Sequence, residues 1–380
     1  MANSTTHSGS ESQFAALTAF LKQDPNNLPL LADAAAAALD ESQPSAAADL
    51  VARYASLSPL PPTVRNIAGL AALNLGRFSE AARIFEDLLA DAPGDPVLRF
   101  NLAWARAVLD DHAGAEALID DAVVQVVPKA AALKVRSLHR LSRLEDALAF
   151  GLGFSERNPD DRVMLGVISL VALDAHEYDL ARSYAERAGP DNSEGLATLG
   201  MLHLAEHRPA EALPLFDASL SLQPGFGRSQ LGRGLAKLAL GEPSEAAMAL
   251  DAGAATFGDH LGTWIATGWA AFVAGDLVRA RERFETALRL DDTFSECHGS
   301  LAAMDVFDGD LETAERRIEV AFRLDQRCFS ASLAKSLMLA AGGDNAGAER
   351  VWEIALNTPL DATGVTIAQA MVNLGISARR

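Results

Sequence analysis

The chain has 380 residues, of which 49% are hydrophobic, and its formal net charge is -19 at neutral pH. This excess of carboxylates argues against nucleic acid and anionic lipid as the main partners, because both bind basic surfaces. No segment approaches the roughly 18 uninterrupted apolar residues of a membrane-spanning helix, so we expect no membrane insertion.

The first eleven residues, 1–11, are polar and contain neither the basic start nor the apolar run of a signal peptide. We expect a disordered tail there. In residues 12–27, Phe14, Leu17 and Phe20 share one helical stripe and Pro25 follows it. This pattern predicts the N-terminal helix of a partial repeat.

A recurring alanine marks the units that follow. It occurs at Ala47, Ala81, Ala115, Ala147, Ala181, Ala212, Ala246, Ala280, Ala314 and Ala348. The interval is 34 residues except for steps of 32 and 31, which place irregular joins near residues 127 and 192. Such a period is typical of a solenoid, in which each helical hairpin buries its apolar face only against its neighbours. We therefore predict ten repeats over 28–362: 28–61, 62–95, 96–127, 128–161, 162–192, 193–226, 227–260, 261–294, 295–328 and 329–362. A C-terminal capping helix, 363–377, and a short tail to residue 380 complete the prediction.

The register is clearest in residues 261–362. Gly275, Gly309 and Gly343 recur there, each followed by an aspartate, and a large apolar residue recurs at Phe284, Ile318 and Trp352. The signature positions of one unit are Trp264, Gly268, Gly275, Ala280, Phe284 and Ala287.

This pattern resembles the tetratricopeptide repeat, a 34-residue helix-turn-helix unit. The resemblance implies an all-α fold, a right-handed superhelical α-solenoid. It agrees with the physical roles of the residues, because small residues let two helices approach closely and glycine suits a helix C-cap. The segment around "DAVVQVVP" is rich in β-branched residues and is predicted to be the weakest helix.

In the tetratricopeptide family, the first helix of each unit lines a concave groove that receives extended peptides or helices. Projecting the groove positions onto this sequence gives Phe100, Asn101, Trp104, Leu170, Met201, Leu235, Ile265, Trp269, Phe272 and Phe307. Large exposed apolar surfaces usually bind a partner. Packing of these side chains against neighbouring helices is the alternative.

A basic island interrupts the acidic chain around the first helix of the fourth unit: Lys129, Lys134, Arg136, His139, Arg140 and Arg143. By the same projection Lys129, Arg136, His139 and Arg140 face the groove, where they would receive acidic groups of a partner. A solvated face balanced by nearby carboxylates is the alternative. The Lys, Asn and Arg clamp of chaperone-binding members is not assembled, and only Asn101 matches the asparagine ladder of members attached to sugar transferases.

Local matches to reactive sites have simpler explanations. His203, Glu206 and His207 have the H-x-x-E-H spacing of inverted zinc proteases, but His207 occupies the turn that other units fill with glycine. The glycines Gly232 and Gly234 follow no predicted strand, so they indicate close packing rather than a phosphate-binding loop. The aspartate pairs, such as Asp110 with Asp111, fit helix ends.

The chain has two cysteines, Cys297 and Cys328, at different positions of adjacent repeats. Helix packing would hold them about 10 Å apart, too far for a disulfide, so we expect reduced thiols in a cytoplasmic protein. We predict no catalytic residue, no metal and no cofactor.

The sequence therefore predicts a non-catalytic scaffold that holds a helical or extended segment of another protein, as an adaptor, chaperone or assembly factor. Two alternatives remain. The chain is a self-associating structural protein, a homo-oligomer, or it is the repeat-type accessory subunit of an enzyme encoded separately. Fold alone does not select among them.

Overall fold

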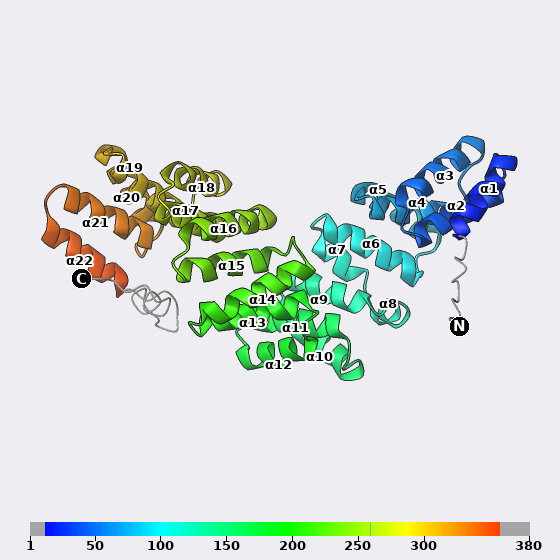
Figure 1. Ribbon diagram of the computed structural model, residues 1–380, viewed down its shortest axis with the longest axis horizontal. Helices are drawn as coiled ribbons and strands as arrows, with labels where there is room; N and C mark the ends of the chain where they lie inside the picture. Colours follow the sequence, from blue (N-terminus) through cyan, green and yellow to red (C-terminus); the bar gives the residue numbers. More distant parts are fainter. Residues whose placement is uncertain (1–11, 259, 358–380) are drawn as a thin grey trace, which may run out of the picture. The chain divides into compact units, whose positions relative to one another are not determined.

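The computed structural model describes residues 12–258 and 260–357, and every regular element in these ranges is an α-helix (Figure 1). The prediction of an all-α repeat fold is confirmed. Two expectations, the tail at 1–11 and the capping helix at 363–377, lie outside the described residues. The chain divides into two compact units, residues 1–160 and 161–380, which are taken one at a time below.

Unit 1 begins with a single helix, α1, and continues in helical hairpins. Its helices are α1 (Gln13–Gln23), α2 (Leu28–Asp40), α3 (Pro44–Leu57), α4 (Pro62–Asn74), α5 (Phe78–Asp91), α6 (Pro96–Val108), α7 (His112–Ala117), α8 (Asp121–Val126), α9 (Ala130–Arg140) and α10 (Leu144–Arg157).

Unit 2 consists, over its described residues, of six hairpins formed by consecutive helix pairs. Its helices are α11 (Arg162–Asp174), α12 (Tyr178–Ala188), α13 (Ser193–Ala205), α14 (Pro209–Leu222), α15 (Gly227–Ala239), α16 (Pro243–Phe257), α17 (Leu261–Val273), α18 (Leu277–Leu290), α19 (Ser295–Phe307), α20 (Leu311–Leu324), α21 (Phe329–Ala341) and α22 (Asn345–Leu356).

Every hairpin turn contains one residue with a left-handed backbone. These residues are Ser42, Gly76, Asp110, Ser142, His176, His207, Gly241, Gly275, Gly309 and Gly343. At the turn after α17, Gly275 has a φ of 83° and the next amide, that of Asp276, donates to the carbonyl of Ala271 at 2.9 Å. The Asp276 carboxylate then accepts from the amide of Arg279 at 3.0 Å and caps α18. The recurring Gly-Asp pair thus ends one helix and begins the next.

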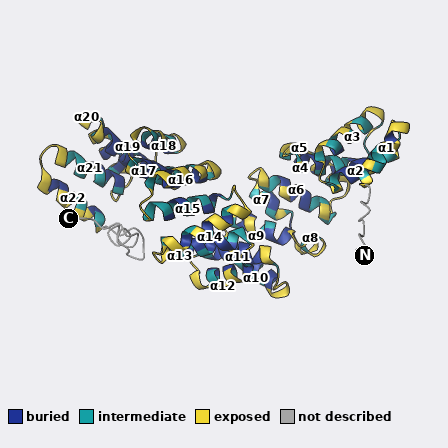
Figure 2. Ribbon diagram, viewed as in Figure 1, coloured by how far each residue is buried: buried dark blue, intermediate teal, exposed yellow. Residues whose placement is uncertain are grey.

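The core follows the repeat register. The recurring alanine is at most 7% exposed in every hairpin, and Phe85, Phe216 and Phe284 in the second helices are fully buried (Figure 2). A glycine on a first helix, of the same hairpin or of the next one, faces each of these rings. A Cβ on Gly268 would lie 2.3 Å from the Phe284 ring, and one on Gly232 would lie 2.2 Å from that of Phe216. The close-packing role expected for Gly232 is confirmed.

The two irregular joins have different structural causes. In the third hairpin the second helix breaks into α7 and α8, and Asp120 begins α8 by accepting from the amide of Val123 at 3.0 Å. The valine-rich segment therefore forms only a six-residue helix. In the fifth hairpin α12 has 11 residues where α14 has 14, and it stops at Gly189, whose φ is 82°. The lost turn of α12 accounts for the shorter repeat.

Within unit 2, an ion pair reaches beyond the adjacent hairpin. Arg228 at the start of α15 donates to both carboxylate oxygens of Asp174 at the end of α11, at 2.8 and 2.7 Å. The pair passes α13 and joins the fifth and seventh hairpins. Bidentate arginine–carboxylate pairs of this kind are among the stronger polar contacts in proteins.

Candidate functional site

In unit 1, an aromatic pair and a lysine form one cluster. Phe100 and Trp104 lie one turn apart on α6 and their rings meet edge to face, with centroids 5.8 Å apart. The ammonium group of Lys129, the residue before α9, lies 4.9 Å from the Phe100 ring centroid and 5.7 Å from that of Trp104. Phe100 is buried, whereas Trp104 is 45% exposed. The cluster therefore presents one supported aromatic ring and a positive charge to solvent.

Three further cations of the basic island, Lys134, Arg140 and Arg143, have partners within unit 1. Lys134 donates to the carbonyl of Ile119 at 2.8 Å, and Arg140 donates to the Asp110 carboxylate at 3.2 Å. The hydrogen bond from Arg140 lowers the pKa of Asp110, and the charge of Arg140 adds to the effect. Arg143 pairs with Asp146 at 2.7 Å. Arg136 and His139 also have interaction partners. The basic island therefore agrees better with a solvated face balanced by nearby carboxylates than with a row of unpaired cations.

Several predicted groove residues are packing residues in the structure. Asn101 is 7% exposed and its Nδ2 finds no hydrogen-bond partner in the part of the chain that the structure describes. Leu170 on α11 is also buried. Met201 and Leu235 are partly buried against the cluster that contains Phe216. For these residues the structure favours the packing alternative.

In unit 2, three of the predicted residues come together with a core phenylalanine in an aromatic ladder: Phe284, Trp269, Phe272 and Phe307. Their successive ring centroids are 5.3, 5.4 and 5.0 Å apart. The ladder starts at the fully buried Phe284 on α18, passes along α17 and ends on α19 at Phe307, which is 53% exposed. Ile265 on α17 packs beside it. Val273, the last residue of α17, is 62% exposed and was not among the predicted residues.

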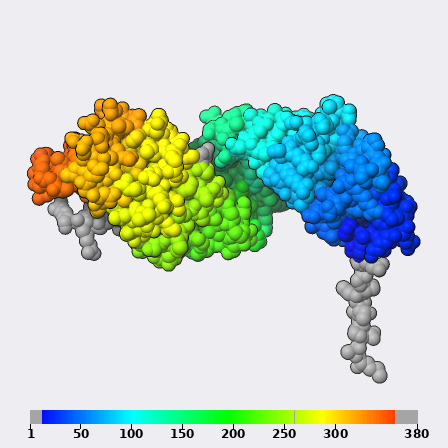
Figure 3. Space-filling model, turned by 90° about the horizontal axis from the view of Figure 1, so that it is seen from above, coloured from blue at the N-terminus to red at the C-terminus, as the bar shows by residue number. Residues whose placement is uncertain are grey.

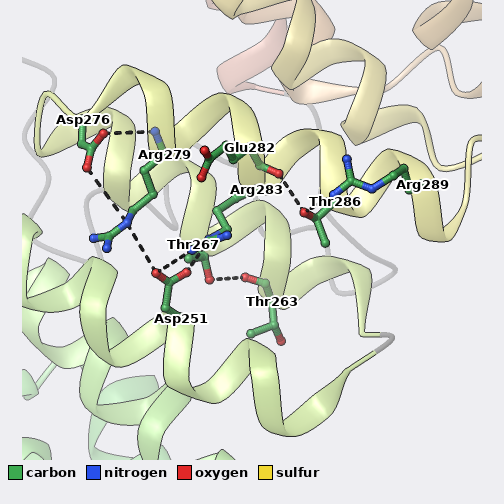
Figure 4. A network of polar contacts seen from close by, with 9 residues as sticks. All are labelled: Asp251, Thr263, Thr267, Asp276, Arg279, Glu282, Arg283, Thr286 and Arg289. Carbon is green, nitrogen blue, oxygen red and sulfur yellow. Dashed lines mark hydrogen bonds and ion pairs between the residues drawn. The ribbon is translucent and has the colours of Figure 1, made fainter.

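A polar network holds the helix that carries Phe284 (Figure 4). The Asp251 carboxylate on α16 accepts from Arg283 on α18 at 2.7 and 3.2 Å, and Arg279 lies 3.5 Å away. The hydrogen bond to Asp251 raises the pKa of Arg283. Between these helices, the Thr267 hydroxyl on α17 donates to the carbonyl of Thr263 at 2.7 Å. The network fixes α18 against α16 and so keeps the buried end of the ladder in place.

The H-x-x-E-H residues do not converge on a common point. His203 Nδ1 lies 3.4 Å from the Glu211 carboxylate, Glu206 pairs with Arg182 and Arg208, and the exposed His207 occupies the turn with a φ of 60°. Over residues 12–258 and 260–357, no group of three or more His, Cys, Asp or Glu side chains is placed to hold a metal ion. Within the same ranges, no helix has the length and apolar character needed to cross a membrane.

Both cysteines are buried and free of disulfides. Burial raises the pKa of the Cys297 and Cys328 thiols to about 12. A thiol in this state is almost entirely protonated at neutral pH, and only the thiolate is a strong nucleophile. Neither cysteine therefore has the character of a reactive group.

Models of the tetratricopeptide repeat match residues 32–96, 72–136, 197–260 and 231–294, which together cover more than half of the chain. Among solved structures, a chain of the APC/C hetero-tetramer Cut9–Hcn1 is 16% identical with a TM-score of 0.55, covering 95% of this chain and 80% of that one. A human IFIT1 dimer with m7Gppp-AAAA is 13% identical with a TM-score of 0.52, covering 91% and 95%. Likeness at these identities shows the fold alone. No curated protein sequence matches the chain.

Proposed function

Because the chain belongs to the tetratricopeptide repeat superfamily, whose repeats generally serve as protein-interaction scaffolds, we propose that it is a non-catalytic scaffold for a partner protein. The partner contributes a helical or extended apolar segment that lies on the first helices of the hairpins. In this role the chain acts as an adaptor, chaperone or assembly factor. We propose the cytoplasm as its compartment, which the two free, buried cysteines support.

The aromatic ladder is the observation that carries the proposal. Phe307 is half exposed, yet its ring is supported by Phe272 and, through Trp269, by the core. A ring held in this way loses little conformational freedom when a partner covers it, so more of its contact energy appears as affinity. Rigid aromatic anchors of this kind dominate many protein interfaces. The expected partner residue here is a large apolar side chain.

The cluster of Phe100, Trp104 and Lys129 in unit 1 favours a different kind of partner residue. Trp104 offers an exposed aromatic surface, and the Lys129 ammonium beside it favours a carboxylate on the partner. A nucleic-acid ligand, such as the capped RNA present with IFIT1, is disfavoured because the net charge is -19 and the cations around α9 already have partners. The role of an accessory subunit for a separately encoded enzyme stays a prediction.

Aspartate substitutions at the exposed anchors test the proposal. Phe307→Asp and Trp104→Asp place a charge where an apolar contact is expected, while Val278→Asp and Val126→Asp place one at positions of unit 2 and unit 1 that are 73% and 57% exposed. Each full-length variant is used to purify partners from the native cell extract, with quantification by mass spectrometry. We expect the anchor variants to lose proteins that the wild type and the control variants retain.

Circular dichroism spectra must coincide for all variants, because the four positions are at the surface. Identical sets of retained proteins for wild type, Phe307→Asp and Trp104→Asp, with intact folds, would refute the proposal for both surfaces.

A further inference from the structure

A cavity of about 650 Å³ lies between α20 and α21, in the orange part of the chain in Figure 3. Its lining comes from one side of α20 with the turn that follows, and from two residues of α21. The residues are Glu315, Ile318, Glu319, Phe322, Arg323 and Gln326, with Lys335 and Met338. The spacing of three and four along α20 means that one face of this helix is turned to the cavity.

One wall of the cavity, α21, is held by close packing against the preceding first helix, α19. A Cβ on Gly299 of α19 would lie 2.4 Å from the amide nitrogen of Ala331 on α21, so the two backbones nearly touch. The Ser300 hydroxyl donates to that of Ser330 at 3.2 Å, and the Glu296 carboxylate accepts from the amide of Phe329 at 2.9 Å. This close approach holds α21 against α19, and α21 lines the cavity together with α20.

The charges around the cavity are separated into two halves. Glu315 and Glu319 lie toward the start of α20, Arg323 lies near its end, and the Lys335 ammonium group of α21 lies 5.8 Å from the ring of Phe322, the residue before Arg323. From Glu315 to Arg323 the helix rises about 12 Å. Between the two halves, Ile318, Phe322 and Met338 form an apolar floor.

These charges lack counterions in the part of the chain that the structure describes. The Glu315 and Glu319 carboxylates form no ion pair there, Lys335 contacts only the Phe322 ring at 5.8 Å, and Arg323 donates only to a backbone carbonyl at 3.3 Å. Other cations of α20 are paired. Arg316 lies 2.9 Å from Glu312, and Arg317 lies 2.9 Å from the buried Asp305. The cavity therefore concentrates unpaired charge on a helix whose other charges are neutralised.

We propose that this cavity is a homodimer interface, and that the face of α20 turned to it pairs with the same face of a second copy of the chain. If the two α20 helices run antiparallel about a two-fold axis, the acidic half of each meets the basic half of the other, and the match is made twice. The two Phe322 rings then lie near the axis, and the apolar floors of the two copies cover each other. A face with only one sign of charge would repel its own copy, so the division into halves favours this occupant.

Reciprocal charge reversal tests the interface in the full-length protein. One variant carries Glu315→Arg with Glu319→Arg, and the other carries Arg323→Glu with Lys335→Glu. The mass of each is measured by sedimentation equilibrium over a concentration series. We expect the wild type to dimerise and each variant to dimerise about tenfold more weakly or worse. An equimolar mixture should recover the dimer, because a wholly basic face then meets a wholly acidic one.

The control is Arg316→Glu, which reverses a charge on the same helix outside the cavity and should dimerise as the wild type does. Circular dichroism establishes that every variant is folded. A wild type that is monomeric at all concentrations overturns the proposal, and so does a mixture that stays monomeric. Either result leaves the cavity to another protein or to residues of the same chain. The Phe307→Asp variant should still dimerise, so loss of the partner protein and loss of the dimer are separate results.

Discussion

At the scale of single residues, the hairpin turns carry local strain in half of the repeats. Ser42, Asp110, Ser142, His176 and His207 have φ values between 58° and 67°. A residue with a Cβ is disfavoured there by roughly 1–2 kcal/mol, whereas glycine is not. Glycine at any of these five turns would therefore relieve strain and raise the free energy of unfolding.

Ser142→Gly should raise the free energy of unfolding by about 1 kcal/mol, because the relief of strain exceeds the extra freedom of glycine in the unfolded chain. The exposed Ser142 side chain contributes little else. Urea denaturation followed by circular dichroism measures the change. The reverse substitution, Gly309→Ser, introduces a side chain at a φ of 79° and should lower stability by a similar amount. A destabilised Ser142→Gly variant would show that the turn is not strained.

The buried thiols give a dependence on pH. The pKa of Cys297 and Cys328 is raised to about 12 by burial, whereas an unfolded cysteine ionises near pH 8.5. Above about pH 8.5 the unfolded chain therefore binds fewer protons than the folded chain, and stability should fall as the pH rises toward 12. Below that pH the two thiols contribute no pH dependence.

Chemical modification at pH 8 tests whether the Cys297 and Cys328 thiols are shielded from solvent in the folded protein. Neither native thiol should react with a disulfide reagent until the protein unfolds, and both should react in denaturant. A Val278→Cys variant, with its thiol at a position that is 73% exposed, should add one fast reaction. A native cysteine that reacts as fast as this control would contradict the burial.

At the scale of helices, three hairpins are held together by contact between a glycine of the first helix and a phenylalanine ring of the second: Gly69 with Phe85, Gly200 with Phe216 and Gly268 with Phe284. Gly268→Ala places a methyl group 2.3 Å from the Phe284 ring, so α17 and α18 must separate or the ring must move. We expect a loss of about 1–3 kcal/mol in unfolding free energy. Gly153 provides the matched control, because it lies in α10 with no atom within 4 Å of its virtual Cβ.

Gly153→Ala should gain up to about 1 kcal/mol from helix propensity alone. Thermal and urea denaturation should therefore show a lower unfolding free energy for Gly268→Ala and a higher one for Gly153→Ala. Equal effects would mean that propensity, not contact with the ring, decides both substitutions.

At the scale of the whole chain, helices contact chiefly their own and the adjacent hairpins. Residues 1–160 form one of the two compact units. A fragment ending at Asp160 should therefore remain helical and unfold cooperatively. A fragment ending at Ser142 lacks α10 and its buried Phe154, and should be less stable by at least about 2 kcal/mol. Scanning calorimetry and circular dichroism distinguish the outcomes, and an unfolded 1–160 fragment would contradict the expectation.

The sequence was sufficient to predict the all-helical fold because the spacing of alanine and large apolar residues directly reflects burial. The recurring alanines and Phe284 are buried as that register requires. The groove positions were harder to predict. Projection assigns Phe100 and Trp104 to the same helix side, but their exposure depends on neighbours in three dimensions.

The cavity beside α20 was missed for a related reason. Its stripe of residues from Glu315 to Gln326 was present in the sequence, but the cavity itself depends on how closely α19 approaches α21. That distance follows from small residues on a different pair of helices. A repeat register specifies which helices are neighbours, and it does not specify their separation.

The ion pair between Arg228 and Asp174 changes how the array would respond to a pulling force. A stack joined only through neighbouring hairpins extends like a soft spring, because each interface yields independently. The two parallel hydrogen bonds of this pair cross the sixth hairpin and must break before the fifth and seventh can be drawn apart. Under tension, these three hairpins form a stiff segment of an otherwise compliant chain.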